Sequence, residues 1–181
     1  MIGTGYVGLV SGVCFSYLGN TVYCVDNDKK KINLLSQGKI PIHEPGLDEI
    51  LKRNVRQKRL FFTSDLKLAV NKADIIFICV GTPTKKKSNS ADLKYVFQVA
   101  KKLRKYIKKY KIVVTKSTVP VSTGDKIEKI LNSKGRKKIV DVVSNPEFLR
   151  EGEAIRDFVY PDRVVVGTNS KKANRIMKSL Y

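Results

Sequence analysis

Long apolar runs and targeting signals are absent from this 181-residue sequence, and their absence limits the classes of protein that it can encode. No stretch approaches the roughly 18 apolar residues that a membrane span needs. The start has neither the basic region nor the apolar region of a secretory signal. We therefore expect a globular, cytoplasmic protein without a membrane partner, and the length favours one domain.

Cysteine and histidine are too few for a disulfide framework or a metal centre. The three cysteines, Cys14, Cys24 and Cys79, are widely spaced in apolar surroundings, and we predict reduced core residues. The single histidine, His43, is followed by Glu44. One histidine with one acid supplies too few ligands for zinc, so no metal is expected and both residues are assigned to the loop of a Pro-Gly turn.

Acidic residues are also scarce, because 16 Asp and Glu accompany 36 Lys and Arg and leave a net charge of +20. Such a charge can attract nucleic acid or anionic ligands. In residues 97–111, however, the lysines lie off a stripe of helical period. That stripe consists of Phe97, Ala100, Leu103, Ile107 and Tyr110. We interpret the lysines as the solvated face of a helix and, without a recognisable motif, expect no nucleic-acid partner.

Short β-branched or aromatic runs alternate with longer helical patterns along the chain. Strands are predicted at residues 21–26, 60–63, 74–80, 112–116, 139–144 and 163–167. Helices are predicted at residues 5–18, 28–36, 47–57, 66–71, 92–109 and 123–133, with a further helical pattern in 170–181. This alternation indicates a doubly wound, Rossmann-type α/β fold with a parallel sheet. The polar stretch 85–90 predicts a loop at a strand end.

A glycine pattern opens the sequence. Gly3, Gly5 and Gly8 match G-x-G-x-x-G, in which the glycines permit a tight turn and a close approach to a pyrophosphate. A predicted strand then ends at Asp26, 18 residues after Gly8. An acid at this place accepts hydrogen bonds from the ribose hydroxyls of NAD and repels the extra phosphate of NADP. The pattern therefore predicts an NAD site.

The first strand of this fold should precede the glycine loop, yet only Met1 and Ile2 come before Gly3. The last helical pattern stops in mid-element. We expect that neither end is a natural domain boundary and that the first strand is truncated.

Four further segments identify a family resemblance. They read PIHEPGL at 41–47, VGTP at 80–83, KSTVPV at 116–121 and NPEFLREG at 145–152. Together they closely resemble the NAD-dependent sugar-nucleotide dehydrogenases, over essentially the whole chain. Residues 3–12, 91–93 and 160–164 are most similar to the members that oxidise UDP-glucose. Members that oxidise GDP-mannose or UDP-N-acetylmannosamine remain alternatives, as does a non-catalytic nucleotide-binding remnant.

The resemblance implies that the C6 alcohol of UDP-glucose is oxidised to UDP-glucuronate while two NAD molecules are reduced in turn. It assigns Tyr6, Val7, Asp26 and Lys31 to the adenosine and phosphates of NAD, although Lys31 is equally consistent with a solvated lysine. It assigns Thr82, Pro83, Ser117 and Thr118 to loops beside the cofactor, and Glu151 to the nicotinamide.

Two of these positions carry catalytic roles in the family. Thr118 corresponds to a threonine that positions the catalytic water, although a turn or N-cap role is also consistent with its local sequence. Glu147 corresponds to a general base in thioester hydrolysis. The sugar pocket corresponds to Glu147, Phe148, Leu149, Arg150 and Glu151. Without the resemblance, Glu147 and Glu151 would be read as one exposed face of a short helix.

Some family features are missing or altered. Ser122 stands where the family has glycine, so its side chain should crowd the cofactor or, because serine is a good N-cap, begin a helix. The family's nucleophilic cysteine, the Lys and Asn of its central helix and its UDP-binding domain correspond to positions beyond residue 181. We expect this chain alone to be inactive and the full-length protein to be a homo-oligomer.

Overall fold

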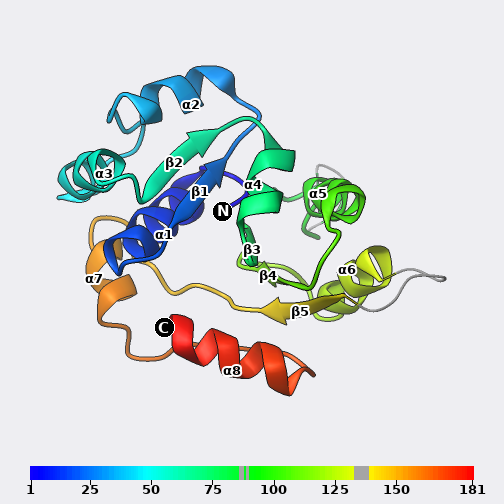
Figure 1. Ribbon diagram of the computed structural model, residues 1–181. Helices are drawn as coiled ribbons and strands as arrows, with labels where there is room; N and C mark the ends of the chain where they lie inside the picture. The colour runs from blue at the N-terminus through cyan, green and yellow to red at the C-terminus, as the bar shows by residue number, and fades with distance from the viewer. Residues whose placement is uncertain (86–87, 89, 133–138) are drawn as a thin grey trace. The chain divides into compact units, whose positions relative to one another are not determined.

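The structure, a computed structural model, describes residues 1–85, 88, 90–132 and 139–181. The chain divides into two compact units. The first comprises Met1–Ala69 and Phe148–Arg163, and the second comprises Val70–Glu147 and Val164–Tyr181. Figure 1 shows the elements of both units.

The first unit contains a parallel pair of strands, β1 (Val22–Val25) and β2 (Leu60–Thr63). Residues 1–3 pair with the other side of β1, where Gly3 N donates to the Val25 carbonyl at 2.8 Å and Val25 N donates to the Met1 carbonyl at 2.8 Å. Met1 and Ile2 are both buried. The two residues that precede the glycine loop therefore act as the end of a parallel strand.

Four helices belong wholly to the first unit. They are α1 (Tyr6–Tyr17), α2 (Lys29–Ser36), α3 (Leu47–Arg56) and α7 (Ala154–Val159). Asp28 caps α2 by accepting from Lys31 N at 3.0 Å. Helix α1 is buried over residues 8–16. At Gly12 an added Cβ would lie 2.5 Å from Cys24 Sγ, so this glycine allows α1 to pack closely on β1.

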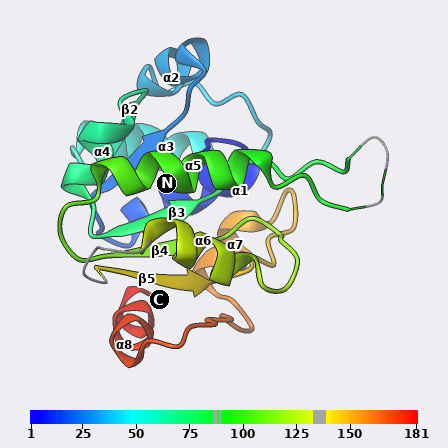
Figure 2. The same cartoon turned by 90° about the vertical axis from the view of Figure 1, so that its right-hand side faces the viewer.

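The second unit contains three parallel strands in the order β3 (Ile75–Ile78), β4 (Lys111–Thr115) and β5 (Val140–Ser144). Helices α5 (Lys94–Tyr106) and α6 (Thr123–Leu131) pack against each other, and α8 (Lys171–Leu180) lies beside β5 (Figure 2). Helix α4 (Leu66–Lys72) contains the boundary between the units. Parallel strands joined through helices confirm the predicted α/β fold class.

The predicted strand at 163–167 is wrong. The chain here forms one antiparallel bridge, in which Gly167 and Ser144 exchange two hydrogen bonds of 2.8 Å. Val164 and Val165 are exposed, and the Val165 carbonyl accepts from the Asn145 amide instead of from a strand. High β-propensity did not produce a strand because the segment lacks a partner along its length.

The remaining element predictions agree with the structure except at α7, which the sequence did not indicate. The predicted loop residues Lys86, Lys87 and Asn89 and the predicted helix end at Ser133 lie outside the described residues. None of the described helices is long and apolar enough to cross a membrane.

The core positions of the cysteines are confirmed. The side chains of Cys14, Cys24 and Cys79 are buried, and no disulfide joins them. Burial raises the pKa of Cys14 to about 12 and that of Cys24 to about 11. These two thiols therefore stay protonated at neutral pH and are poor nucleophiles.

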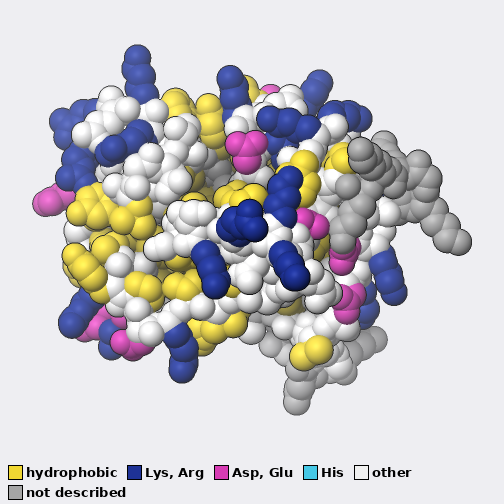
Figure 3. All heavy atoms as spheres, turned by 60° about the horizontal axis from the view of Figure 1, so that its bottom comes forward, with side chains coloured by type: hydrophobic (Ala, Val, Ile, Leu, Met, Phe, Trp, Pro, Cys, Tyr) yellow, Lys and Arg dark blue, Asp and Glu magenta, His cyan; other side chains and the backbone are white. Residues whose placement is uncertain are grey.

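The amphipathic character of the lysine-rich helix is also confirmed. Of the predicted stripe, Ala100, Leu103 and Ile107 are buried and Phe97 and Tyr110 are half-buried, whereas the lysines of residues 101–109 are exposed. On the face drawn in Figure 3, basic side chains are dispersed and do not form one patch. The positive charge of this face is thus spread over solvated surface.

Candidate functional site

The glycine loop leads directly into α1 and leaves room for a ligand. Gly3 has a φ of 98°, a conformation that side chains disfavour. A Cβ added to Gly5 would meet no heavy atom within 4 Å. Helix α1 begins at Tyr6, and Gly5 provides no side-chain cap. The first-turn amides can therefore receive a phosphate, which fits the pyrophosphate of a dinucleotide.

Asp26, directly after β1, is hydrogen-bonded to Thr4 of the glycine loop. One carboxylate oxygen of Asp26, Oδ2, accepts from Thr4 N at 2.9 Å and from Thr4 Oγ1 at 2.7 Å. The other oxygen accepts from Asp28 N at 3.1 Å. Oδ2 also accepts from Lys31 Nζ at 3.4 Å, whereas Oδ1 accepts the bond from Asp28 N. Each carboxylate oxygen has about two acceptor positions, so Oδ1 keeps one for a ribose hydroxyl.

The charge of Asp26 is stabilised by its surroundings. Burial favours the neutral acid, but the hydrogen bonds from Thr4 and Asp28 and the charge of Lys31 outweigh it and lower the pKa of Asp26. Lys31 Nζ lies 3.4 Å from Asp26 Oδ2, so this lysine is an ion-pair partner and is not free in solvent. Asp26 is therefore an anion at neutral pH.

Tyr6, the first residue of α1, turns its hydroxyl toward residues 150–152. The hydroxyl donates to the Glu44 carboxylate and accepts from Gly152 N at 3.3 Å. Burial, followed by the hydrogen bond to Glu44, raises the pKa of Tyr6 to about 12. The structure thus joins the glycine loop to the segment predicted to bind sugar. Val7 and Gly8 lie in the same first turns of α1.

Glu44 makes contacts that the sequence did not predict. It does lie in a loop, as predicted, but its side chain is buried, with 4% exposed. Its carboxylate accepts from Gly152 N at 2.8 Å and from Ile155 N at 3.3 Å. The signal available in the sequence was an acid inside a Pro-rich motif, which has no local partner. Among the described residues, no group of three or more His, Cys, Asp or Glu could hold a metal.

Within the predicted sugar segment, Arg150 is engaged by α7. Its Nη2 lies 2.7 Å from Asp157 Oδ1, its Nε donates to Asp157 Oδ2 at 3.1 Å, and its backbone N donates to the same oxygen at 2.9 Å. Phe148 stacks against Arg163, with the guanidinium carbon 4.9 Å from the ring centre. Leu149 is half-buried and Glu151 is exposed. This segment is thus held by side chains of its own unit.

In the second unit, the loops that follow β3 and β4 are tied together. Thr82 Oγ1 donates to the Thr118 carbonyl at 3.0 Å, and Ser117 Oγ donates to the Val80 carbonyl at 2.7 Å. Thr118 and Pro83 are both exposed. Four predicted cofactor residues therefore lie together at the carboxyl ends of parallel strands, where α/β folds bind ligands.

A buried lysine, Lys116, lies at the same end of β4 and was not predicted. Its Nζ donates to Asn145 Oδ1 and to the Tyr181 hydroxyl, each at 3.2 Å. Burial lowers the pKa of Lys116, and the charges of Cys79 and Glu147 act in the opposite direction. Glu147 is half-buried, two residues after Asn145. The predicted base therefore lies within electrostatic reach of a buried cation.

Ser122 adopts the left-handed conformation, with a φ of 69°, at the N-cap position of α6. Its side chain makes no capping hydrogen bond. The helix thus begins directly after Ser122, as expected, but the serine hydroxyl does not cap it. The conformation itself accounts for glycine at this position in the family, because glycine adopts positive φ without strain.

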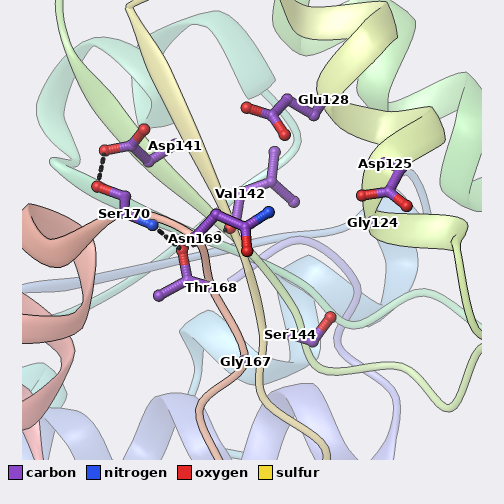
Figure 4. A pocket seen from close by; sticks show the side chains of 10 residues that line it. All are labelled: Gly124, Asp125, Glu128, Asp141, Val142, Ser144, Gly167, Thr168, Asn169 and Ser170. Carbon is purple, nitrogen blue, oxygen red and sulfur yellow. Dashed lines mark hydrogen bonds between the residues drawn. The ribbon is translucent and has the colours of Figure 1, made fainter.

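A pocket of about 310 Å³ lies elsewhere in the second unit (Figure 4). Three carboxylates line it, those of Asp125, Glu128 and Asp141. Asp141 accepts from Ser170 Oγ at 2.6 Å, and Ser170 Oγ in turn caps α8 at Ala173 N. None of the predicted site residues lines this pocket, and its hydrogen bonds hold α8 beside β5.

The parallel strands, the glycine loop before α1 and the acid after β1 define a dinucleotide-binding domain of the Rossmann type. Residues 1–181 match the family model described as the NAD binding domain of the UDP-glucose/GDP-mannose dehydrogenase family. The chain belongs to this family of NAD-dependent dehydrogenases, and NAD is the cofactor of the domain.

Curated relatives are similar over the whole chain. The UDP-glucose 6-dehydrogenase of Rhizobium meliloti is 51% identical over 100% of this chain, which covers 42% of that protein. The UDP-glucose 6-dehydrogenase TuaD of Bacillus subtilis is 51% identical over 100% of this chain, which covers 39% of that protein. The chain thus spans about two fifths of the length of these relatives.

Two solved structures share the fold at 38% identity. A GDP-mannose dehydrogenase from Pseudomonas aeruginosa has a TM-score of 0.95, with 99% of this chain and 43% of that chain covered. A UDP-glucose dehydrogenase from Pyrobaculum islandicum has a TM-score of 0.94, with 99% of this chain and 42% of that chain covered.

Proposed function

We propose that this chain is the NAD-binding portion of an enzyme that oxidises C6 of UDP-glucose to UDP-glucuronate with two NAD molecules. The observation that carries the proposal is Asp26, held by Thr4 against the glycine loop, in a chain that is 51% identical to two UDP-glucose 6-dehydrogenases. GDP-mannose is a weaker candidate because the two relatives at 51% identity are UDP-glucose 6-dehydrogenases, whereas at 38% identity a GDP-mannose dehydrogenase and a UDP-glucose dehydrogenase are equally similar.

The family model for one NAD-binding domain covers both units, so we keep the prediction that residues 1–181 form one such domain. In this proposal the backbone of Gly3, Gly5 and Gly8 approaches the pyrophosphate, with Tyr6 and Val7 beside it. Asp26 would accept from the adenosine ribose, and Lys31 would keep that carboxylate in place. Thr82, Pro83, Ser117, Thr118 and Glu151 complete the proposed cofactor set.

NAD supplies a hydride acceptor when bound, and the proposed roles of this chain concern protons and orientation. Thr118 presents an exposed hydroxyl that would orient a water molecule, and Glu147 would accept the proton of that water. The proposed sugar contacts are Glu147, Phe148, Leu149, Arg150 and Glu151. Lys116, a nearby cation, would attract the Glu147 carboxylate.

In this proposal, none of the three cysteines of this chain is the nucleophile of the reaction. Cys14 and Cys24 are buried with raised pKa values, and Cys79 is buried as well. We therefore expect this chain alone to bind NAD without completing the oxidation. Turnover would require a further segment, on the same chain or on another, that supplies the thiol and binds the UDP-sugar. We propose a homo-oligomer for that longer protein.

The test is a NADH-absorbance assay on the chain combined with the segment that supplies the cysteine. UDP-glucose should give more turnover than GDP-mannose or UDP-N-acetylmannosamine. Glu147→Gln should release NADH in the first turnover and then stall at the acyl-enzyme, whereas Glu49→Gln, a change of an exposed glutamate, should behave like wild type. Normal steady-state turnover of Glu147→Gln would rule out the role of the base, and preference for GDP-mannose would rule out the substrate.

A further inference from the structure

The Glu44 carboxylate joins three segments that are far apart in the sequence of the first unit. One of its oxygens accepts from the Tyr6 hydroxyl and from Gly152 N at 2.8 Å, and the other accepts from Ile155 N at 3.3 Å. The sequence separations are 38, 108 and 111 residues. With 4% of its surface exposed, Glu44 makes these bonds away from water.

The first consequence concerns α7. Glu153 occupies the N-cap position of this helix but makes no capping hydrogen bond with its side chain. Glu44 supplies the missing acceptor from a distant loop and places a negative charge at the helix N-terminus, where the helix dipole favours it. The start of α7 therefore depends on Glu44.

The second consequence concerns the glycine loop. Tyr6 is the first residue of α1, immediately after Gly5, and its hydroxyl lies 3.4 Å from the Arg150 carbonyl as well as 3.3 Å from Gly152 N. The segment that contains Glu151 is thus bonded to the start of α1 in two ways. Arg150 and Gly152 contact the Tyr6 hydroxyl directly, and Gly152 N also donates to the Glu44 carboxylate that accepts from Tyr6.

We propose that Glu44 is a positioning residue that couples the 150–152 segment to the dinucleotide loop. The Glu44 latch consists of Tyr6, Glu44, Gly152 and Ile155. This inference rests on the proposed function, because it takes NAD to bind at the glycine loop. Closing the latch holds Glu151 and the amides of the segment in the arrangement that receives NAD, and opening it reduces the population that can bind.

If Glu44 only stabilised the fold, its replacement would affect NAD binding differently. Loss of stability lowers every affinity only through the folded fraction, which stays near one while the protein remains well folded. The latch predicts a local opening of residues 150–155 and a weaker NAD complex in protein that is otherwise folded. Leu51→Val, a core change in α3 that touches none of the four latch residues' hydrogen bonds, serves as the control for stability.

The experiment combines amide hydrogen exchange with calorimetric titration of NAD on the wild-type chain and four variants. Glu44→Ala should accelerate exchange at Gly152 and Ile155 by about 2- to 30-fold, the range that corresponds to a lost helix cap. It should also raise the Kd for NAD, by no more than that same factor, because the binding-competent population falls as the segment opens. Glu49→Gln should leave both quantities unchanged.

Glu44→Gln is the conservative substitution, which keeps part of the hydrogen bonding of Glu44. An amide keeps one acceptor oxygen, so it can serve either the Gly152 side or the Ile155 side, but not both. It should restore protection at one of these amides and recover part of the NAD affinity, whereas Leu51→Val should leave exchange at both amides and the NAD affinity at wild-type values.

The two hypotheses fail in different ways. If the wild-type chain does not bind NAD, the proposed function is wrong. If wild type binds NAD and Glu44→Ala binds it with the same Kd, or shows unchanged exchange at Gly152 and Ile155, the latch is overturned and the proposed function stands.

Discussion

Replacing Ser122 by glycine should stabilise the protein by about 0.5–1 kcal/mol. Ser122 has a φ of 69°, and a side chain in this left-handed conformation costs about 1–2 kcal/mol. Glycine offsets part of that gain, because its freedom in the unfolded chain costs about 0.5–1 kcal/mol. The serine side chain is exposed and makes no capping hydrogen bond, so its removal sacrifices no contact of that kind.

Urea denaturation measures this change directly. The midpoint of Ser122→Gly should rise without a change in the slope m, since the substitution exposes no additional surface on unfolding. Ser122→Ala is the matched control, because it removes the hydroxyl but keeps the Cβ in the strained conformation. Lys58→Gly provides an independent second site, since exposed Lys58 has a φ of 55° just after α3.

The reasoning is refuted if Ser122→Gly is no more stable than Ser122→Ala. That result would mean that the hydroxyl, and not the backbone conformation, determines the energy at this position. If Lys58→Gly raised the free energy of unfolding and Ser122→Gly did not, the explanation would be wrong only for the backbone at the start of α6.

Two pH-dependent predictions follow from ionisable groups of the first unit. The pKa of Tyr6 is raised to about 12 from an ordinary value near 10, so its contribution to stability is complete below about pH 10 and is lost as the pH rises through about 12. Denaturation between pH 9 and pH 12 should therefore show a smaller loss of stability in Tyr6→Phe than in wild type, and equal losses would contradict the raised pKa of Tyr6. The Arg150 guanidinium lowers the pKa of Asp157 to about 2, so this contribution is present above about pH 4 and is lost as the pH falls through about 2. In carboxyl-carbon NMR titrations, Arg150→Gln should move the Asp157 pKa toward 4, and an unmoved pKa would show that another group holds the charge.

Local sequence patterns predicted the parts of the molecule whose causes are local. Hydrophobic periodicity gave the helices and the five strands because burial on a helix or sheet face repeats with the period of the element. The glycine spacing and Asp26 were predictable for the same reason, since a tight turn and a following strand are close in sequence. The resemblance then added Thr82, Ser117 and Thr118, and the structure places these three together.

What escaped prediction depends on partners distant in sequence. Glu44 meets Gly152 and Ile155 across more than a hundred residues, and no periodicity records such a bond. The same holds for buried Lys116, whose hydrogen-bond partners include Tyr181 at the far end of the chain. The false strand at 163–167 failed for the complementary reason, because its β-branched residues have the propensity but no neighbouring strand to pair with.

Calorimetric titration of both dinucleotides is the sharpest test of the NAD site that we assign to Asp26 and the glycine loop. Wild type should bind NAD more tightly than NADP, because the charged carboxylate beside the loop accepts from the ribose hydroxyls and repels the extra phosphate. Asp26→Asn should weaken NAD binding and narrow that preference, while Asp48→Asn, at a partly exposed carboxylate in α3, should change neither. Equal affinity of wild type for NAD and NADP, or an unchanged preference in Asp26→Asn, would rule out this role of Asp26.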